Sequence, residues 1–354
     1  MSTDTSEIRA ALRGMLADVC GQDAVVAAEP LGWNEQVWQT LDEAGFTLIG
    51  VAEDAGGSGG TLTDGAVVLQ ELGRASASVP YAEHALIAGW LLTESGRDLG
   101  EGVRTAAVLT GRDELSIDNG AVSGTVARVP WARAADRIVL VAPSGDGAQV
   151  AVVDRSSVEI RPGRNLADEA RDTIRLDRAA GETWTIDAGA LREARLRLAF
   201  ARAALISGAL ERVQEISVRY TGEREQFGRP VARFQAVQRH LVKIAEQTHL
   251  ARMAVDAAAY GDRTTLDEFA VSAAKIIASE SASAATAHAH QAHGAIGMTK
   301  EYELGQLSRR LWSWRDEGGS ETAWGESLGE AIAEAGADAL WPRISDGVHE
   351  AATS

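Results

Sequence analysis

The chain has 354 residues but only one cysteine, Cys20, and its acidic side chains outnumber the basic ones. A single cysteine cannot close a disulfide within the chain. The 34 lysines and arginines against 51 aspartates and glutamates give a formal net charge of −17, which repels phosphate backbones and anionic lipid surfaces. The sequence also lacks the run of about 18 apolar residues that a membrane-spanning helix requires. We therefore expect no nucleic-acid partner and no membrane insertion.

The opening residues contain no basic segment followed by an apolar segment, which is the pattern of a secretory signal. Together with the single cysteine, this absence favours a cytoplasmic protein. The chain does contain 45% hydrophobic residues, enough to bury a substantial core in two or three structural units.

The spacing of apolar residues changes twice along the chain and predicts three domains. Residues 1–104 show helical spacing and predict an amino-terminal helical domain. Residues 105–186 contain short β-rich runs separated by turn-forming residues, which predict a small β domain. Residues 187–354 return to helical spacing in long alanine-rich segments, which predict a bundle. The expected fold is mainly helical, with a small β domain in the middle.

Individual elements can be placed within these domains. Val37, Trp38 and Leu41 fall on one face of an expected helix, and residues 66–74 form another that ends at Gly73. The expected strands cover residues 137–143, 148–154, 157–161 and 172–177. The expected long helices cover residues 190–222, 232–260, 266–292 and 323–340.

Residues 54–60, D-A-G-G-S-G-G, form a glycine-rich segment. Glycines allow backbone N–H groups to approach an anion, so a phosphate site is one interpretation. The segment lacks the Lys-Ser/Thr pair of a phosphate-binding loop, and a flexible turn is the favoured interpretation.

Three of the seven histidines lie in A-H-A-H-Q-A-H-G, residues 287–294. His290 and His293 would share a helix face, whereas His288 would point away from it, so a three-histidine metal site would need a broken helix. No carboxylate stands at ligand spacing. Polar residues at a helix end are the favoured interpretation, and we expect no metal.

The segment R-E-Q-F-G-R-P-V-A-R-F-Q-A-V-Q, residues 224–238, follows a long expected helix. A Phe-Gly turn and Pro230 end the first helix and turn the chain before a new helix begins with Phe234 and Gln235. The planar guanidinium of Arg224 suits a diphosphate, and Gln or Phe can hold an adenine. The alternative is an inter-helix turn with a surface arginine, which the residues alone favour slightly.

Three carboxylates surround a Gly-Gly pair in R-R-L-W-S-W-R-D-E-G-G-S-E-T-A-W, residues 309–324. Only glycine enters the left-handed region without steric cost, so we expect Asp316, Glu317 and Glu321 to lie at a helix end beside a sharp turn. A charged, solvated helix end is the ordinary interpretation of such a cluster, and a catalytic base is the other.

Taken together, these segments resemble the acyl-CoA dehydrogenase family. Residues 41–61 and 68–74 are similar to the glycine turn and following helix of its first domain. The strongest likeness is the pair R-E-Q-F-G-R-P-V-A-R-F-Q and Q-A-H-G-A-I-G-M-T-K-E-Y, residues 224–235 and 291–302. The resemblance implies a helical amino-terminal domain, a β-barrel-like middle domain and a carboxy-terminal four-helix bundle.

The resemblance also implies an FAD cofactor bound between subunits. It matches Arg224 to the arginine that meets the diphosphate and Phe227 to the aromatic residue after it. Residues 291–297 match the flavin-facing turn of the neighbouring subunit. The other implied cofactor-binding residues are Gln226, Gln235, Gln291, Gly294, Ala295 and Gly297.

The implied reaction is the α,β-dehydrogenation of an acyl-CoA thioester to a trans-2-enoyl-CoA. A carboxylate in a desolvated pocket removes the α-proton while the β-hydrogen leaves as a hydride to the flavin. An electron-transfer flavoprotein is the implied electron acceptor. The implied setting is lipid degradation, by a homo-oligomer or by a heterotetramer with a sister subunit.

The implied base is Glu317, because E-G-G-S-E-T resembles the E-G-T motif that often carries the base in this family. When the family pattern is aligned from Gln291 onward without gaps, however, the position of the base falls on Gly318. A base at Glu321 or Asp316, or no base at all, therefore stays open.

The expected helix before the Arg224 segment also departs from the family. Leu198 occupies the position that holds the base in some members, so that alternative site is vacant. Ala199 stands beside it, where many members carry an arginine. The nearby arginines that could compensate are Arg195, Arg197 and Arg202.

The β domain departs further. The family's T-E-P…G-S-D segment has no counterpart in residues 104–117, and Arg128, Pro130 and Trp131 stand where members often place Trp and Thr beside the flavin. Two other functions therefore stay open beside that of a self-sufficient dehydrogenase. One is a partner subunit that completes a flavin site without abstracting a proton. The other is a flavin oxidase or monooxygenase on the same fold.

Overall fold

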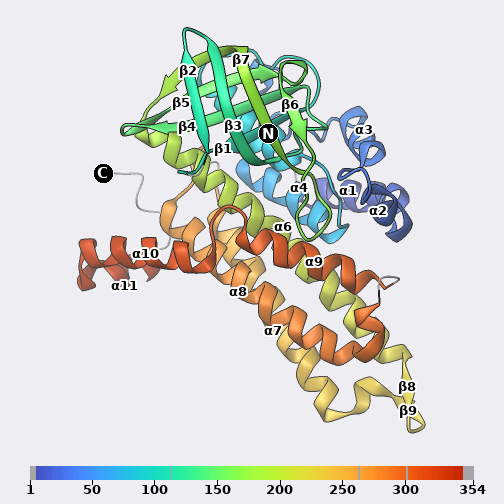
Figure 1. Ribbon diagram of the computed structural model, residues 1–354. Coiled ribbons are helices and arrows are strands. Elements are labelled where there is room, and N and C mark those ends of the chain that lie inside the picture. Colours follow the sequence, from blue (N-terminus) through green and yellow to red (C-terminus); the bar gives the residue numbers. More distant parts are fainter. Residues whose placement is uncertain (1–4, 112, 262–263, 300–301, 346–354) are drawn as a thin grey trace. The chain divides into compact units, whose positions relative to one another are not determined.

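The computed structural model describes residues 5–111, 113–261, 264–299 and 302–345 (Figure 1). The chain forms two compact units, Met1–Leu198 and Ala199–Ser354. The boundary between them falls inside one long helix, α6 (Ala188–Glu223). Among the segments quoted above, Arg112, Lys300 and Glu301 lie outside the described residues.

The first unit begins with short helices, of which α3 and α4 are capped by side chains. They are α1 (Thr5–Val19), α2 (Gln22–Ala28), α3 (Glu35–Glu43), the 3-10 turn η1 (Glu53–Ala55), α4 (Leu62–Arg74), the π-helical segment η2 (Ala82–Gly89) and α5 (Trp90–Glu94). The Asn34 side chain accepts the Val37 N–H at the start of α3. A capping box of Thr61 and Asp64 starts α4.

The helical spacing of this unit is confirmed. Val37, Trp38 and Leu41 are all buried on one face of α3. The predicted helix at residues 66–74 lies within α4, but its predicted stop at Gly73 is wrong. The helix runs one residue further and closes on a right-handed residue, so no left-handed glycine is needed there.

A twisted sheet occupies the rest of the first unit. Its strands are β1 (Arg104–Val108), β2 (Glu114–Asp118), β3 (Ala121–Pro130), β4 (Arg137–Ser144), β5 (Gly147–Asp154), β6 (Glu159–Arg161) and β7 (Arg171–Ile186). The order is β1-β4-β5-β7-β3-β2, with β6 also paired to β7. Strand β1 runs parallel to β4, and the other pairs are antiparallel. The long strand β7 joins the two halves of the sheet.

The sheet has a continuous apolar core that explains its alternating sequence. Val122, Val126, Ile138, Leu140 and Ile174 are completely or almost completely buried within it. The four predicted strands are confirmed, and so is the mainly helical fold with a central β-sheet domain. The domain boundaries at residues 104 and 186 stay predictions.

The second unit is helical apart from one small hairpin. After α6 come β8 (Glu225–Gln226), β9 (Arg229–Pro230), the 3-10 turn η4 (Val231–Arg233), α7 (Gln235–Ala258), α8 (Glu268–His293), the 3-10 turn η5 (Gly294–Met298), α9 (Glu303–Asp316), α10 (Glu321–Ala335) and α11 (Ala337–Ser345). The first three predicted helices are confirmed. The fourth, at residues 323–340, is split at Gly336, whose φ is 84°.

Alanine allows the helices of this unit to pack closely. Ala274, Ala278, Ala282, Ala285 and Ala289 repeat along α8 and are completely buried. Small side chains at helical spacing bring neighbouring backbones together, and α8 packs extensively against α7 and α9. In Figure 1 these three helices lie side by side.

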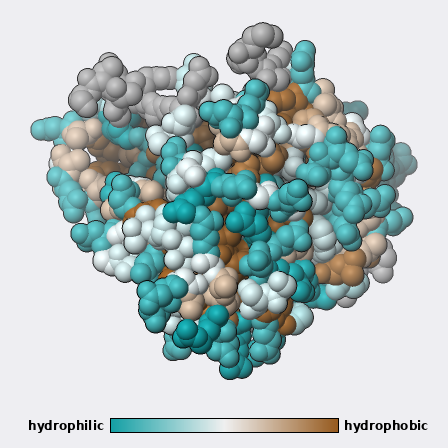
Figure 2. Space-filling model, turned by 90° about the horizontal axis from the view of Figure 1, so that it is seen from above, coloured by the Kyte–Doolittle hydropathy of each residue, from teal (hydrophilic) through white to brown (hydrophobic). Residues whose placement is uncertain are grey.

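The surface mixes polar and apolar residues. On the face seen in Figure 2, hydrophilic residues are interspersed with hydrophobic ones. Among the described residues, no helix combines the length and apolar character needed to span a membrane.

Candidate functional site

Helix α9 ends in a sharp turn that carries the candidate base. Glu317 caps the helix with an extended backbone. Gly318 and Gly319 follow with φ angles of 72° and 97°, in the left-handed region that favours glycine. Ser320 then caps α10 by accepting the Ala323 N–H at 3.3 Å. The predicted placement of the acids at a helix end beside a glycine turn is confirmed.

Trp324 fixes the conformation of this turn. Its indole Nε1 donates to the Gly318 carbonyl oxygen at 2.8 Å. A Cβ atom added at Gly319 would lie 2.5 Å from the same nitrogen. The close approach of the indole therefore leaves no room for a side chain at residue 319.

The Glu317 carboxylate is paired with an arginine from α6. Arg202 Nε donates to Glu317 Oε2 at 2.9 Å, and the two side chains are only 3% and 11% exposed. Arg202 lies three residues after Ala199, so it projects from nearly the same helix face. Of the three arginines near Ala199, Arg202 is the one that reaches the turn, while Arg197 pairs with Glu193 at 2.7 Å.

The other two acids of the cluster have different surroundings. The Asp316 side chain is 64% exposed, and its Oδ1 lies 3.3 Å from Arg315 Nε. Glu321 begins α10, and its Oε2 is buried without a hydrogen-bond partner among the described residues. Asp316 thus fits a solvated helix end, whereas Glu317 and Glu321 are the shielded carboxylates.

A buried lysine lies behind the turn. The Lys275 side chain on α8 is completely buried, and its Nζ donates to Ser279 Oγ at 3.0 Å and to the carbonyl oxygens of Trp314 at 3.3 Å and Arg315 at 2.6 Å. Burial lowers the pKa of Lys275 to about 7. The positive charge of Arg202 adds to this shift, and nearby carboxylates oppose it.

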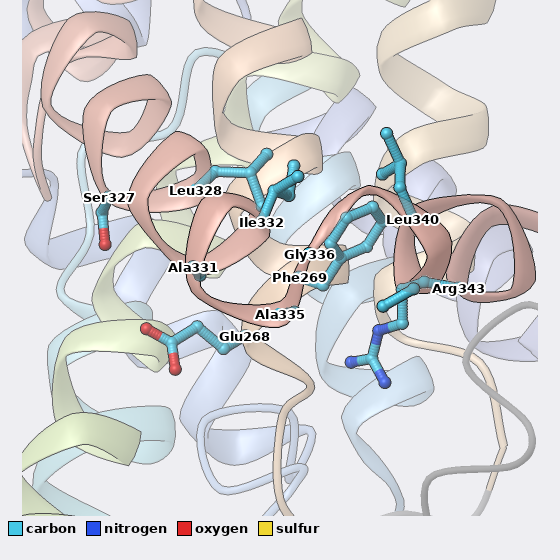
Figure 3. Close-up of a pocket in the computed structure, with 11 residues that line it drawn as sticks. Glu268, Phe269, Ser327, Leu328, Ala331, Ile332, Ala335, Gly336, Leu340 and Arg343 are labelled. Atoms are coloured by element: carbon cyan, nitrogen blue, oxygen red, sulfur yellow. The ribbon is translucent and has the colours of Figure 1, made fainter.

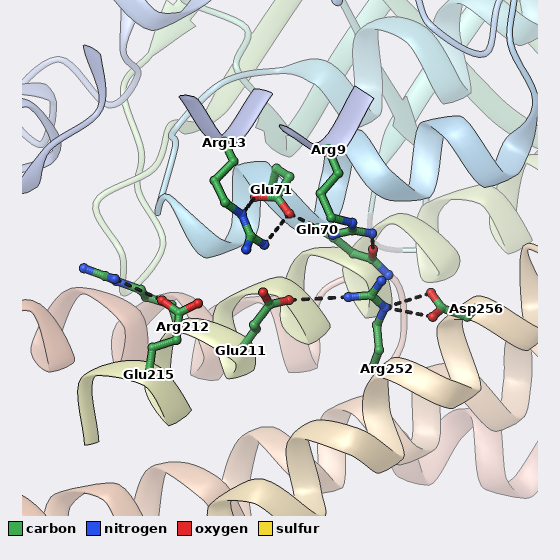
Figure 4. Close-up of polar contacts among 9 residues, drawn as sticks. All are labelled: Arg9, Arg13, Gln70, Glu71, Glu211, Arg212, Glu215, Arg252 and Asp256. Atoms are coloured by element: carbon green, nitrogen blue, oxygen red, sulfur yellow. Dashed lines mark hydrogen bonds and ion pairs between the residues drawn. The ribbon is translucent and has the colours of Figure 1, made fainter. Parts of the chain in front are cut away.

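Two further charge clusters are structural in character (Figure 4). In the first unit, buried Glu71 accepts from Arg9 at 2.7 Å and from Arg13 at 2.8 Å. In the second unit, Arg252 lies between Glu211 and Asp256 (Figure 4). Each of these carboxylates faces an arginine within its own unit, so they are ordinary ion pairs.

The Arg224 segment forms an exposed hairpin between α6 and α7. Strands β8 and β9 pair antiparallel, and Phe227 and Gly228 connect them with φ angles of 52° and 76°, as in a type I′ turn. The Phe227 side chain is 92% exposed. Arg224, Gln226 and Gln235 are also exposed. The predicted cofactor residues of this segment thus lie together on the surface of the second unit.

The second predicted cofactor segment lies at the end of α8. Gln291, Gly294 and Ala295 are exposed, whereas Gly297 is buried. Gly294 has a φ of 64°, and a Cβ atom there would meet open space. At Gly297 a Cβ atom would lie 3.0 Å from the His293 Cβ. The backbone thus favours glycine at residue 294, and close packing leaves little room for a side chain at residue 297.

The three histidines of this segment have separate partners. His288 Nδ1 lies 3.0 Å from Nδ1 of His240, and His290 Nε2 lies 2.9 Å from Ser308 Oγ. His293 Nδ1 bonds to the Ala289 carbonyl at 2.8 Å. Among the described residues, no group of three or more metal-ligating side chains converges. The geometry matches polar residues at a helix end.

The glycine-rich segment at residues 54–60 is a closely packed turn. Five of its amide N–H groups donate to carbonyl oxygens of residues 48–53 at 2.8 to 3.2 Å. A Cβ atom at Gly57 would lie 2.2 Å from the Val51 carbonyl oxygen. The turn is therefore packed rather than flexible, and these amides are already occupied.

Trp131 of the sheet is part of the core of the first unit. Its side chain is buried, and Nε1 donates to Glu83 Oε2 at 2.8 Å. The Arg171 guanidinium lies 5.0 Å from the ring centre. Arg128, by contrast, is exposed, with a φ of 59°. Trp131 therefore has a structural role within this unit.

The second unit also contains an apolar pocket of about 330 Å³ (Figure 3). Figure 3 shows Phe269 of α8, Ile332 of α10 and Leu340 around it. At its edge, Arg343 forms an ion pair with Asp267. None of the predicted site residues lines this pocket.

Sequence reasoning did not identify Arg202 or Lys275 as parts of the site. Arg202 was one of three arginines with equal claims, and only the contact with α9 selects it. Lys275 did leave a signal, because it falls between Val271, Ala274 and Ala278 on the apolar face of α8. A lysine in such a position must be paired or hydrogen-bonded.

Two family profiles match the chain. The profile described as "Acyl-CoA dehydrogenase, N-terminal domain" matches residues 2–99, and "Acyl-CoA dehydrogenase, C-terminal domain" matches residues 181–332. The acyl-CoA dehydrogenase IpdE2 of Mycobacterium tuberculosis is 30% identical over 306 residues, which cover 84% of this chain and 87% of that protein.

Solved structures share the fold. One is the ChsE4–ChsE5 complex from Mycobacterium tuberculosis, with a TM-score of 0.84 and 21% identity, covering 95% of this chain and 99% of the matched one. Another is PigA with FAD and proline, with a TM-score of 0.81 and 18% identity, covering 95% and 99% of the two chains. At these identities the likeness establishes the fold alone.

Proposed function

Because the chain belongs to the acyl-CoA dehydrogenase family, we propose that it catalyses the FAD-dependent α,β-dehydrogenation of an acyl-CoA thioester, with Glu317 as the base. The observation that carries this proposal is the shielded Glu317 carboxylate at the end of α9, paired with Arg202 at 2.9 Å. The product is a trans-2-enoyl-CoA.

The residues of the turn have distinct tasks in this reaction. Glu317 takes the proton from the α-carbon, whose C–H bond the thioester carbonyl has acidified. When bound, FAD would supply the acceptor for the hydride of the β-carbon. Arg202 Nε donates to the Glu317 carboxylate and so holds it in one orientation. After the transfer, the neutral carboxyl group stays in place through the same guanidinium.

The predicted cofactor residues have chemistry that fits FAD. Arg224 offers an exposed guanidinium to a diphosphate, and Gln226, Gln235 and Gln291 offer exposed amide donors. Gly294 exposes backbone with open space above it. We propose that these residues bind FAD together with Phe227, Ala295 and Gly297. PigA, which shares the fold, has been solved with FAD.

Substitution of Glu317 tests the assignment of the base. The FAD-loaded Glu317→Gln protein should reduce its flavin with the best acyl-CoA substrate about 10²- to 10⁴-fold more slowly than the unchanged protein, because the amide cannot accept the proton. Anaerobic stopped-flow absorbance of the flavin gives this rate. Asp316→Asn is the matched control, since it neutralises the adjacent exposed carboxylate. An unchanged rate in Glu317→Gln would reject Glu317.

A second candidate function is that of a partner subunit in a heteromeric enzyme. All the proposed cofactor residues except Gly297 are exposed in the single chain, which fits a site completed by another chain, either a second copy or a sister subunit. Such residues need a second chain to enclose a ligand. The fold is shared with a complex of two differently named chains, ChsE4 and ChsE5.

Purification of the chain alone separates the two functions. A flavin that bleaches with acyl-CoA in the lone protein supports a self-sufficient homo-oligomer. A colourless protein, or a flavin that never bleaches, supports a heterotetramer with a sister subunit. Rapid reoxidation of the reduced flavin by oxygen would instead identify an oxidase or monooxygenase. The proposed electron acceptor is an electron-transfer flavoprotein, and the proposed setting is cytoplasmic lipid degradation.

A further inference from the structure

The carboxy-terminal turn of α9 accepts hydrogen bonds from two side chains of α8, Lys275 and Ser279, and Ser279 Oγ lies 3.3 Å from the Arg315 carbonyl oxygen. Lys275 Nζ reaches two of the last carbonyl oxygens of α9, those of Trp314 and Arg315, at 3.3 and 2.6 Å. The last carbonyls of a helix have no partners within it, and a cation near them also interacts favourably with the helix dipole. Lys275 therefore acts as a C-cap supplied from α8.

The capped carbonyls directly precede the proposed base. Arg315 and Asp316 end α9, and Glu317 is the next residue. The Glu317 N–H bonds back to the Ser313 carbonyl at 3.3 Å, which continues the same turn. Any change in the direction of these carbonyls moves the Glu317 backbone and, with it, the carboxylate.

We propose that Lys275 is a positioning residue for the reaction: by capping α9 it fixes the Glu317 backbone, while Arg202 fixes the Glu317 carboxylate. This inference rests on the proposed function of Glu317 as the base. Lys275 is completely buried, so it acts through the turn and touches no ligand.

The environment of Lys275 supports a specific role rather than passive packing. The charged groups that face it come from three neighbouring elements: Arg202 on α6, Asp316 and Glu317 at the end of α9, and Glu321 on α10. A completely buried ammonium is costly, because its desolvation must be offset by hydrogen bonds. All three Nζ hydrogens have acceptors, counting Ser279 Oγ at 3.0 Å.

Amide hydrogen exchange of the full-length protein measures the cap without reference to catalysis. Lys275→Met removes the donor and preserves the apolar stem. We expect the amides of residues 314–318 to exchange about tenfold faster in this variant, because the turn opens locally. Thr286→Val is the matched control. It removes a different side-chain contact between α8 and α9, the 3.1 Å bond to Trp312 Nε1, and should leave this segment unchanged.

A kinetic measurement distinguishes positioning from general stabilisation. Lys275→Met should lower the rate of flavin reduction at saturating acyl-CoA while leaving KM unchanged, because Lys275 contacts no substrate. The rate of flavin reduction in the unchanged protein should also change with pH near pH 7, where Lys275 gains or loses its proton, and this change should be absent in Lys275→Met. Thr286→Val should keep that change.

Each result has a defined meaning. Unchanged exchange at residues 314–318 in Lys275→Met, or an equal acceleration in Thr286→Val, overturns the cap. Faster exchange with unaltered flavin reduction and pH profile overturns the positioning role. If Lys275→Met does not fold, Ser279→Ala replaces it, and the same segment should exchange about threefold faster because Nζ loses one acceptor and the Arg315 carbonyl loses its 3.3 Å bond from Ser279 Oγ. An unchanged rate in Ser279→Ala then overturns the proposal.

The same variants distinguish a failure of the proposed function of Glu317 from a failure of the proposed role of Lys275. If Glu317→Gln keeps full activity while Lys275→Met exchanges faster, the base assignment is wrong and the cap remains. If Glu317→Gln is inactive and Lys275→Met behaves like the unchanged protein in every measurement, the base stands and the role of Lys275 fails.

Discussion

Arg202 Nε lies 2.9 Å from Glu317 Oε2, and both side chains are largely removed from solvent. Removing one partner of a shielded ion pair leaves the other charge without compensation. We therefore expect Arg202→Met to lower the free energy of unfolding by about 3 kcal/mol, as measured by urea denaturation at pH 7.

Lys243→Met is the control for this prediction. Lys243 pairs with Glu246 at 2.7 Å, but the two side chains are 43% and 46% exposed. An exposed pair on one helix contributes about 0 to 1 kcal/mol. Equal losses in the two variants would show that the Arg202–Glu317 pair carries no special weight in stability.

Gly319 and Gly325, which lie on either side of Trp324 in the sequence, allow a paired test of the turn. Gly319→Ala should destabilise the protein by about 1 to 3 kcal/mol, because residue 319 has a φ of 97° and a Cβ atom would meet the indole. Gly325→Ala should stabilise it by about 0.5 to 1 kcal/mol, because this residue lies inside α10 with open space around it. Thermal unfolding of both variants checks the predicted opposite signs.

The sequence indicated most of the fold because periodicity is a local property. The strands from residue 137 onward alternate clearly, and the long alanine-rich helices repeat at helical spacing. Helix α9 was missing from the predicted helices, since its run of arginines and tryptophans at residues 309–315 hides the apolar face. Leu304, Leu307 and Leu311 nevertheless form that face and are completely buried.

The site was less accessible from the sequence because its contacts join distant segments. Glu317 and its glycine turn could be located by local rules alone. Arg202 stands 115 residues before Glu317, and nothing in the sequence ranks it above Arg195 or Arg197. The contact of Lys275 with α9 spans 40 residues in the same way. Such pairings depend on how the helices pack, which single-sequence patterns do not specify.

The lowered pKa of Lys275 gives stability a defined pH dependence. The ordinary lysine pKa of 10.5 applies to the unfolded chain, and burial lowers it to about 7 in the folded protein. Between these values the unfolded state binds more protons, so folding stability rises with pH. Relative to Lys275→Met, the unchanged protein should gain up to about 1.4 kcal/mol per pH unit above pH 7.

Below pH 7 both states of Lys275 carry the proton, and the stability difference between the two proteins should stop changing. Urea denaturation of both proteins at several pH values from 6 to 9 measures this difference, and subtraction removes the contribution of the other titrating groups. A difference that stays constant from pH 6 to 9 would show that the folded protein does not lower the lysine pKa into this range.

Substitution of Phe227 should affect FAD binding more than it affects the stability of the protein. Phe227 occupies a left-handed position in a type I′ turn, which favours asparagine, and its side chain is 92% exposed. Phe227→Asn should change the free energy of unfolding by less than about 1 kcal/mol, because the gain in the turn is offset by the loss of the edge-on contact with Phe234. If Phe227 contacts FAD as proposed, the same change should weaken FAD binding about tenfold, measured by fluorescence titration of the apoprotein.

Val242→Asn is the control for this last prediction, because Val242 is an apolar residue of α7 that is 63% exposed and has no proposed cofactor role. FAD affinity should be unchanged in this variant. The Phe227 ring meets Phe234 edge-on, with 6.1 Å between the ring centres, yet its side chain stays 92% exposed in a left-handed position, so a binding role is a physical reason to keep it. Equal FAD affinity in Phe227→Asn and the unchanged protein would remove that reason and leave the hairpin as a connection between α6 and α7.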